Sequence, residues 1–232
     1  MYDTSIAKDE FRKWSRSYDR SILQHLLFGP SHRAIIRRLT GRFGNEPFKV
    51  LDVGCGTGVF AESMRTALPN AEVWGVDLVS AMLDKGRDRW QAHAGRIVPI
   101  QGDSERLPFA SGTFDALTCA NSFHHYPRQD RAVAEMRRVL APGGTLLLID
   151  GYRDGPWGWL IYDVCVAGVE GDVLHCSRRR FRDLFSGAGM FELTQKVHMG
   201  FAPFLVNEAI APATVPTPHV EVVAKAKLVG AV

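Results

Sequence analysis

The chain has 232 residues, 46% hydrophobic and 23% charged, so it is long enough and apolar enough for one large globular domain. Its net charge is only +3, and this small excess argues against a nucleic-acid partner, which usually requires a concentrated Lys/Arg face. No apolar run approaches the roughly 18 residues that span a bilayer, so we expect no membrane-spanning segment.

The four cysteines do not form a C-x-x-C pair, which argues against a structural zinc site. We expect four reduced thiols in a cytoplasmic protein. Residues 1–19 are too charged for a secretory signal, which agrees with that location. No cluster of metal ligands is visible in the sequence, and we therefore predict a metal-independent protein.

Residues 1–46 are expected to form an N-terminal helical unit ahead of the first strand. Phe11, Trp14 and Tyr18 recur at i, i+3 and i+7, the spacing of one helix face. This apolar stripe indicates either packing against the core or a lid over a ligand. A second helix is predicted over 22–39, with a break at its Gly-Pro pair.

A short buried strand, 50–53, runs into three glycines at every second position, Gly54, Gly56 and Gly58. A strand that passes through glycines into a helix brings backbone N–H groups and a helix N-terminus close to a ligand. Glycine suits this turn because it has no side chain to block the ligand and it tolerates positive φ. The next strand ends at Asp77, 19 residues after Gly58, where a carboxylate can accept both hydroxyls of a ribose.

Strands and helices alternate from here on, which predicts a parallel sheet with helices on both faces. The predicted strands are 49–54, 72–76, 96–101, 113–119 and 145–150, and the predicted helices are 58–67, 80–93 and 128–140. Ser80 is a candidate N-cap, and residues 141–144 form a turn before the fifth strand.

Four stretches together carry a family resemblance. The G-x-G-x-G spacing of DVGCGTGVF and the acid that ends VWGVD resemble motifs of class I S-adenosylmethionine-dependent methyltransferases. QGDSERLPF followed by Phe114-Asp115 looks like a further segment of that family, and LAPGGTL resembles its turn before strand five. The resemblance covers about 48–150, and its nearest group is the quinone-biosynthesis-like small-molecule methyltransferases of type 11.

This resemblance implies that the chain binds S-adenosylmethionine and releases S-adenosylhomocysteine. Asp77 would then hold the ribose, Asp103 would accept from the adenine amine, and Ser104 would offer its backbone N–H to the ring. The ring of Tyr18 would lie near the cofactor sulfonium, which is attracted to an aromatic face. The cofactor-binding residues implied are Tyr18, Asp52, Gly54, Cys55, Gly56, Gly58, Asp77, Leu78, Met82, Asp103, Ser104, Ala120 and Asn121.

Residues 47–232 are predicted to form the methyltransferase domain, with 151–176 either covering the acceptor pocket or packing in the core. Ser177 should cap a helix over 178–187, followed by a sixth strand over 191–197. Residues 200–218 are Pro-rich and are predicted to be an irregular crossover, and the alternating pattern of 219–227 predicts the last strand. The resemblance implies a Rossmann-like, doubly wound, seven-stranded sheet of order 3-2-1-4-5-7-6 with strand seven antiparallel.

The loops after strands four and five should border the reactive methyl group, because ligands of open α/β sheets bind at the carboxyl ends of strands. His124 or His125 is the candidate general base, and only one of these adjacent residues should face the acceptor. The candidate acceptor contacts are Tyr126, Asp150, Tyr152, Trp157 and His175.

These features predict methyl transfer to a small molecule by in-line displacement. A tRNA or protein methyltransferase and a non-catalytic cofactor-binding scaffold or regulator remain alternatives. A dinucleotide oxidoreductase is disfavoured because the third glycine comes one residue too early for its fingerprint. The sequence leaves open the acceptor, the atom methylated and the oligomeric state, for which a homodimer is one alternative.

Overall fold

The computed structural model describes residues 28–170 and 173–213. Its centre is a seven-stranded sheet of order β3-β2-β1-β4-β5-β7-β6, which confirms the predicted topology. Strands β1 to β5 pair in parallel, and β7 runs antiparallel to both of its neighbours. The strands are β1 Phe48–Val53, β2 Ala71–Asp77, β3 Ile97–Gln101, β4 Phe114–Ala120, β5 Leu140–Gly151, β6 Phe191–His198 and β7 Phe204–Ile210.

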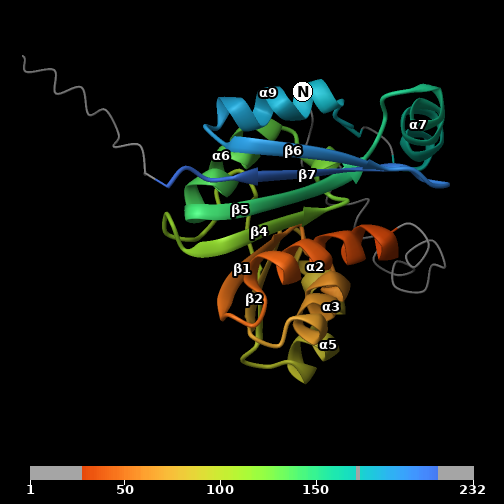
Figure 1. Ribbon diagram of the computed structural model, residues 1–232. Coiled ribbons are helices and arrows are strands. Elements are labelled where there is room, and N and C mark those ends of the chain that lie inside the picture. The colour runs from red at the N-terminus through yellow and green to blue at the C-terminus, as the bar shows by residue number, and fades with distance from the viewer. Residues whose placement is uncertain (1–27, 171–172, 214–232) are drawn as a thin grey trace, which may run out of the picture.

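Helices cover both faces of the sheet (Figure 1). On one face lie α2 (Gly29–Phe43), α3 (Val59–Ala67) and α5 (Arg87–Ala92), and on the other lie α6 (Gln129–Val139) and α9 (Arg178–Gly187). The remaining helices are α4 Ser80–Lys85, the 3₁₀ turn η3 Phe123–His125, α7 Pro156–Trp159, the π-helix η4 Leu160–Val166 and α8 Ala167–Glu170. Among the described residues, no helix has the length and apolar character needed to cross a membrane.

Side chains of β1 alternate between two buried clusters, one on each face of the sheet. Val50 packs with Ile35 and Met64 from the α2–α3 side, whereas Leu51 packs with Met136 from the α6–α9 side. All five side chains are fully buried, and burying each one contributes about 1.5–3 kcal/mol. Burial on both faces holds the carboxyl ends of the parallel strands at one rigid edge.

The position predicted for the last strand is wrong. Strand β7 occupies 204–210, inside the segment expected to be an irregular crossover, while 219–227 lies outside the described residues. This strand is buried on both faces between β5 and β6, so it shows no polar–apolar alternation. Its buried Asn207 donates to Leu148 O at 3.3 Å and accepts from Gln195 Nε2 at 2.8 Å.

The helix predicted over 80–93 is divided in two at Gly86. A Cβ there would lie 2.5 Å from the carbonyl oxygen of Thr57, so glycine allows this helix to approach the glycine loop. Ser80 is the first helical residue and not the N-cap, a position held by Val79. Ser177 does cap α9, because its hydroxyl accepts from the backbone N–H of Arg180.

Residues 141–144 bulge within β5. Leu140 pairs with Phe114 and Thr145 pairs with Ala116, so the turn predicted here interrupts the pairing with β4. At the other end of the chain, α2 begins at the Gly-Pro pair where the predicted second helix breaks. The division into an N-terminal unit and a main domain stays a prediction, because residues 1–27 lie outside the described part of the chain.

Candidate active site

The predicted site residues follow the carboxyl ends of five neighbouring strands. Because β1 to β5 are parallel, these ends meet at one edge of the sheet, on the right in Figure 1. Gly54 follows β1, Asp77 ends β2, and Asp103 comes two residues after β3. Ala120 ends β4, and Asp150 is the penultimate residue of β5.

The glycine loop needs glycine for two physical reasons. Gly54, Gly56 and Gly58 have φ of +76°, +56° and +80°, a region that L side chains rarely adopt. A Cβ on Gly54 would also lie 2.4 Å from Ser122 Oγ, and one on Gly58 would lie 1.8 Å from the Trp90 ring. The loop therefore presents bare backbone at the end of β1.

Asp77 ties this loop to the end of β2. Its Oδ2 accepts from the backbone N–H of Gly56 at 2.8 Å, and its Oδ1 accepts from that of Val79 at 2.9 Å. Burial raises the pKa of the Asp77 carboxyl despite these two hydrogen bonds. Each oxygen keeps acceptor capacity for a ligand hydroxyl. Leu78 follows it half-buried, and buried Met82 packs beside Gly56.

Asp52 and Cys55 lie below the loop surface. The Asp52 carboxylate is 2% exposed and accepts from Thr118 Oγ1 at 2.7 Å. Burial raises the pKa of Asp52 to about 7 and raises the pKa of the Cys55 thiol well above its usual value. These side chains support the loop from inside the sheet.

Asp103 organises the turn after β3. Its Oδ1 accepts from the backbone N–H of Glu105 at 2.9 Å, and its backbone forms a bridge with Arg106. Asp103 is exposed and Ser104 is half-buried at this edge. Asn121, at the other side of the glycine loop, has φ of +55° and donates from Nδ2 to Ser31 Oγ at 3.0 Å. This contact brings the start of α2 to the edge of the site.

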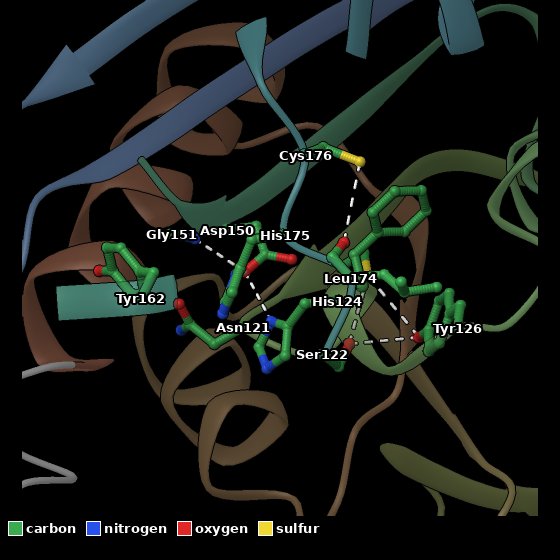
Figure 2. Close-up of polar contacts among 12 residues, drawn as sticks. Asn121, Ser122, His124, Tyr126, Asp150, Gly151, Tyr162, Leu174, His175 and Cys176 are labelled. Carbon is green, nitrogen blue, oxygen red and sulfur yellow. Dashed lines mark hydrogen bonds and ion pairs between the residues drawn. The ribbon is translucent and has the colours of Figure 1, made fainter. Parts of the chain in front are cut away.

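A buried group of His124, Asp150 and His175 lies at the ends of β4 and β5 (Figure 2). His124 Nδ1 is 2.7 Å from Asp150 Oδ1, which also accepts from the backbone N–H of Gly151. His175 Nδ1 is 3.7 Å from the same oxygen, and the two imidazole rings are 4.5 Å apart. The three residues are 6%, 1% and 7% exposed.

Hydrogen bonds join the segment that carries His175 to η3 and α6. The backbone N–H of Leu174 donates to His124 O at 2.7 Å, and Gln129 Nε2 donates to Leu174 O at 2.8 Å. The Cys176 thiol donates to Gln129 Oε1 at 3.1 Å. These bonds bring His175, from the predicted pocket cover, against the end of β5.

The charges around Asp150 determine which atoms of Asp150 and His124 carry a proton. Burial alone would raise the pKa of Asp150, but the charges and hydrogen bonds of His124 and His175 outweigh it and hold that pKa well below its usual range. An ionised carboxylate can only accept, so Nδ1 of His124 donates to it. In neutral His124 the lone pair is therefore on Nε2, as a general base requires.

Residues 50–144 match the family described as a methyltransferase domain.

Over 159 residues the chain is 38% identical to the ubiquinone/menaquinone biosynthesis C-methyltransferase UbiE of Methylobacterium nodulans, covering 66% of this chain and 62% of that protein. It is 42% identical over 106 residues to a demethylmenaquinone methyltransferase of Deinococcus radiodurans, covering 46% of this chain and 44% of that protein. The chain thus spans less than two thirds of the length of these relatives.

The fold of this chain also recurs in solved structures. Magnesium protoporphyrin IX methyltransferase from Synechocystis PCC 6803, solved with bound S-adenosylhomocysteine, aligns with a TM-score of 0.72. The alignment covers 90% of this chain and 100% of that one at 16% sequence identity, a level that speaks for the fold alone.

The other predicted acceptor contacts are spread around the domain. Tyr126 lies under the glycine loop, and its hydroxyl is 3.2 Å from Ser122 Oγ and 3.7 Å from Cys119 Sγ (Figure 2). Tyr152 is half-buried against the core, and its backbone N–H donates to Pro203 O. Trp157 is 45% exposed, and Tyr18 lies outside the described residues.

The second predicted base, His125, packs against the first. Its ring centroid is 4.1 Å from that of His124. Burial, and then the charge of His124, lower the pKa of His125 well below its usual value. His125 is therefore neutral, and the contact with the Asp150 carboxylate belongs to His124.

Tyr162 is a site neighbour that the sequence did not single out. Its ring is 5.0 Å from that of His175, and its hydroxyl donates to Pro203 O at 2.7 Å. A Cβ on Gly151 would lie 2.5 Å from the Tyr162 ring. The glycine directly after Asp150 was the available signal that a bulky side chain approaches the end of β5.

His124, Asp150 and His175 offer ligand atoms that all lie within 4.8 Å of one another. Two histidines and a carboxylate form a donor set that transition metals use. The 2.7 Å contact between His124 Nδ1 and Asp150 Oδ1 is, however, the length of a charge-assisted hydrogen bond. Within the described residues this cluster has both the chemistry of a proton-transfer pair and the composition of a metal site.

Proposed function

We propose that this protein transfers the methyl group of S-adenosylmethionine to a small-molecule acceptor and leaves S-adenosylhomocysteine. The observation that carries the proposal is the buried His124–Asp150 pair at the strand edge that also holds the glycine loop. The likeness to two quinone-pathway methyltransferases supports the cofactor and the reaction type. The closest functional class is therefore a small-molecule methyltransferase.

The cofactor would lie along the carboxyl ends of β1 to β4. The Asp77 carboxylate would accept from the ribose hydroxyls, and the backbone of Gly54 and Gly56 would border the amino-acid end. Asp103 and Ser104 would hold the adenine. Leu78, Met82, Ala120 and Asn121 would complete the walls, and Tyr18 would face the sulfonium.

Methyl transfer is an in-line displacement at carbon, in which the acceptor atom bonds to the methyl group as the carbon–sulfur bond breaks. Sulfur in the sulfonium is already a good leaving group, so positioning is a large part of the task, and oriented reactants gain roughly 7–11 kcal/mol. His124 Nε2 would take the proton of the acceptor, a role that contributes about 10²- to 10⁴-fold. Asp150 would hold the ring and stabilise the imidazolium that forms.

The acceptor would be bounded by the segment 151–176, with Tyr152, Trp157 and His175 as contacts and Tyr126 as support for the loop. Residues 1–46 would close the site as a lid. We also propose that the reaction needs no metal, because Asp150 is ionised and already accepts hydrogen bonds from His124 and Gly151. The free thiols of Cys55, Cys119, Cys165 and Cys176 agree with a cytoplasmic location.

The experiment that tests this function is transfer of a labelled methyl group. The purified chain is incubated with methyl-labelled S-adenosylmethionine and a cell extract separated into small molecules, RNA and protein. Label is expected in the small-molecule fraction, and it should be lost with His124→Ala but kept with His93→Ala, a histidine at the end of α5 that contacts Glu62 of α3. Label in RNA or protein would instead assign a macromolecular acceptor. No label in any fraction would favour a cofactor-binding scaffold.

A further inference from the structure

Exposed apolar side chains gather at one end of the molecule. Of the large hydrophobic residues exposed in the described ranges, all but Phe191 fall between 157 and 174 or between 199 and 201. They are Trp157, Trp159, Leu160, Val164, Leu174, Met199 and Phe201. Scattered apolar residues need no explanation, but a contiguous set marks a surface for a partner or a membrane.

Contacts join the two segments into one surface, which we call the apolar tip and define as Trp157, Trp159, Leu160, Met199 and Phe201. Trp157 Nε1 donates to Phe201 O at 3.0 Å, and the two rings meet edge to face at 6.3 Å. Met199 and Phe201, in the turn between β6 and β7, are 72% and 74% exposed. Figure 1 places α7 beside this end of β6 and β7.

Leu160 and Val164, four residues apart on the π-helix η4, extend this surface as a stripe of exposed apolar side chains. Between 156 and 168 the only charged side chain is Asp163, which is paired with Arg153 at 2.6 Å. The stripe therefore presents no unpaired charge that would oppose contact with hydrocarbon. Tryptophan and phenylalanine on the apolar side of a helix are typical of segments that lie in a membrane interface.

Cations adjoin the apolar tip on the α2 face of the sheet. Lys196 and His198 are at the end of β6, just before Met199, and Arg37 on α2 is an exposed residue. The ion pair of Arg38 with Glu208 of β7 places α2 over the strand next to β6, and the charges of Arg38, Lys196 and Arg37, after burial, lower the pKa of His198. Arg38 is paired with Glu208 at 3.3 Å, which leaves Arg37 and Lys196 as the exposed cations of this group.

We infer that the apolar tip and the adjoining cations dock this protein on a membrane surface that contains anionic lipid. Apolar side chains would enter the headgroup boundary while Arg37 and Lys196 meet the lipid phosphates. Tyr162 links this surface to the site, since its ring is 5.0 Å from that of His175. Docking would therefore turn the His124 end of the sheet toward the bilayer. The inference goes beyond methyl transfer and does not depend on it.

The test is sedimentation of the full chain with vesicles of phosphatidylcholine alone or with about one third phosphatidylglycerol. We expect binding to the anionic vesicles, weaker binding to the neutral ones, and a loss of binding as salt rises. The double variant Trp159→Ser/Phe201→Ser should bind at least about tenfold more weakly, because each ring loses its burial in the interface. Phe191→Ser, an equally exposed apolar residue at the other end of β6, should bind as the unchanged protein does.

A second pair of variants tests the charge. In Arg37→Gln/Lys196→Gln, the affinity for anionic vesicles should fall roughly fivefold for each cation removed, and the affinity for neutral vesicles should hardly change. Arg87→Gln should change neither affinity. Affinity for S-adenosylmethionine should be the same in every variant, which separates a failure of docking from a failure of the proposed function. The inference is overturned if the unchanged protein sediments with neither vesicle or if Phe191→Ser weakens binding as much as the double variant. It is also overturned if Trp159→Ser/Phe201→Ser abolishes self-association in sedimentation velocity without changing lipid binding.

Discussion

His124 Nδ1 lies 2.7 Å from Asp150 Oδ1 although the two residues are 26 positions apart in the chain. One follows β4 and the other is the penultimate residue of β5, so adjacent parallel strands bring them together. The carboxylate is buried and ionised, so it accepts the hydrogen bond from Nδ1, and the lone pair of the neutral histidine lies on Nε2. A base held in this way, at the edge that carries the glycine loop, is the centre of the proposed mechanism.

His124→Ala should lower kcat by about 10²- to 10⁴-fold without changing the affinity for S-adenosylmethionine. Asp150→Asn should lower kcat as well, because an amide does not fix the tautomer or stabilise the imidazolium. Steady-state kinetics and calorimetry of the same preparations check both. A parallel loss of cofactor affinity in His124→Ala would place this histidine in the cofactor site and contradict its role as base.

Asp77→Asn should weaken cofactor binding by tenfold or more and also loosen the loop, because Asp77 accepts from Gly56 and Val79. Asp84→Asn removes an exposed carboxylate on α4 that is paired with Arg87, and is the matched control. Calorimetric titration with S-adenosylhomocysteine measures both. Equal affinities of the two variants would show that Asp77 only supports the fold.

Asp52 should make stability depend on pH. Burial raises its pKa to about 7 in the folded chain, above the value of about 3.9 expected when unfolded. The folded state therefore holds the proton more tightly, so the stabilisation is complete below about pH 4 and is lost as pH rises toward 7. Between pH 4 and 8 the free energy of unfolding should fall by an amount of the order of 2–4 kcal/mol because of Asp52. Asp52→Asn should make this decrease smaller, as measured by urea unfolding at each pH. An unchanged slope would show that Asp52 ionises as readily in the folded chain as in the unfolded one.

Gly58→Ala should destabilise the fold by more than about 3 kcal/mol, since its Cβ would lie 1.8 Å from Trp90 in addition to the strain of positive φ. Gly95→Ala is the matched control, because φ there is +76° with no atom within 4 Å of the new Cβ. The free energy of unfolding of that variant should fall by only about 1–2 kcal/mol, because it has the backbone strain of positive φ and no steric clash. Thermal and urea unfolding compare the two, and equal losses would remove the steric argument for the loop.

Removal of divalent metal should leave activity unchanged. The prediction follows from the hydrogen bond that already joins His124 to Asp150. Activity is measured after dialysis against a chelator, and metal content is measured in the untreated protein. One equivalent of bound zinc, with activity lost on its removal, would make His124, Asp150 and His175 ligands.

The sequence predicted the part of the fold that local physics determines. Glycines at alternate positions and the acid of Asp77 identify a loop whose backbone φ and close contacts require those residues. Strands β1 to β5 were predictable because buried parallel strands are short apolar runs between turn residues. Strand β7 was not, since a buried strand with Asn207 and Glu208 at its centre has no period to detect.

The assembly of the candidate base was predictable only in part. His124 and Asp150 were named because both follow strand ends, but their contact depends on the pairing of β4 with β5. His175 lies in a segment without a recognisable motif. Its position beside Asp150 depends on the hydrogen bond from the backbone N–H of Leu174 to His124 O. Such contacts arise from tertiary packing, and no local pattern of residues encodes them.

The central claim is that this edge of the sheet binds S-adenosylmethionine. Thermal unfolding with S-adenosylmethionine, S-adenosylhomocysteine and NAD in parallel tests it most directly. A ligand at 100 times its Kd adds about 2.7 kcal/mol, and each kcal/mol raises the Tm of a chain of this size by roughly 2–4 °C. We predict a higher Tm with both adenosyl ligands and an unchanged Tm with NAD. A shift with NAD alone would contradict the roles of Gly54, Asp77 and Asp103 together.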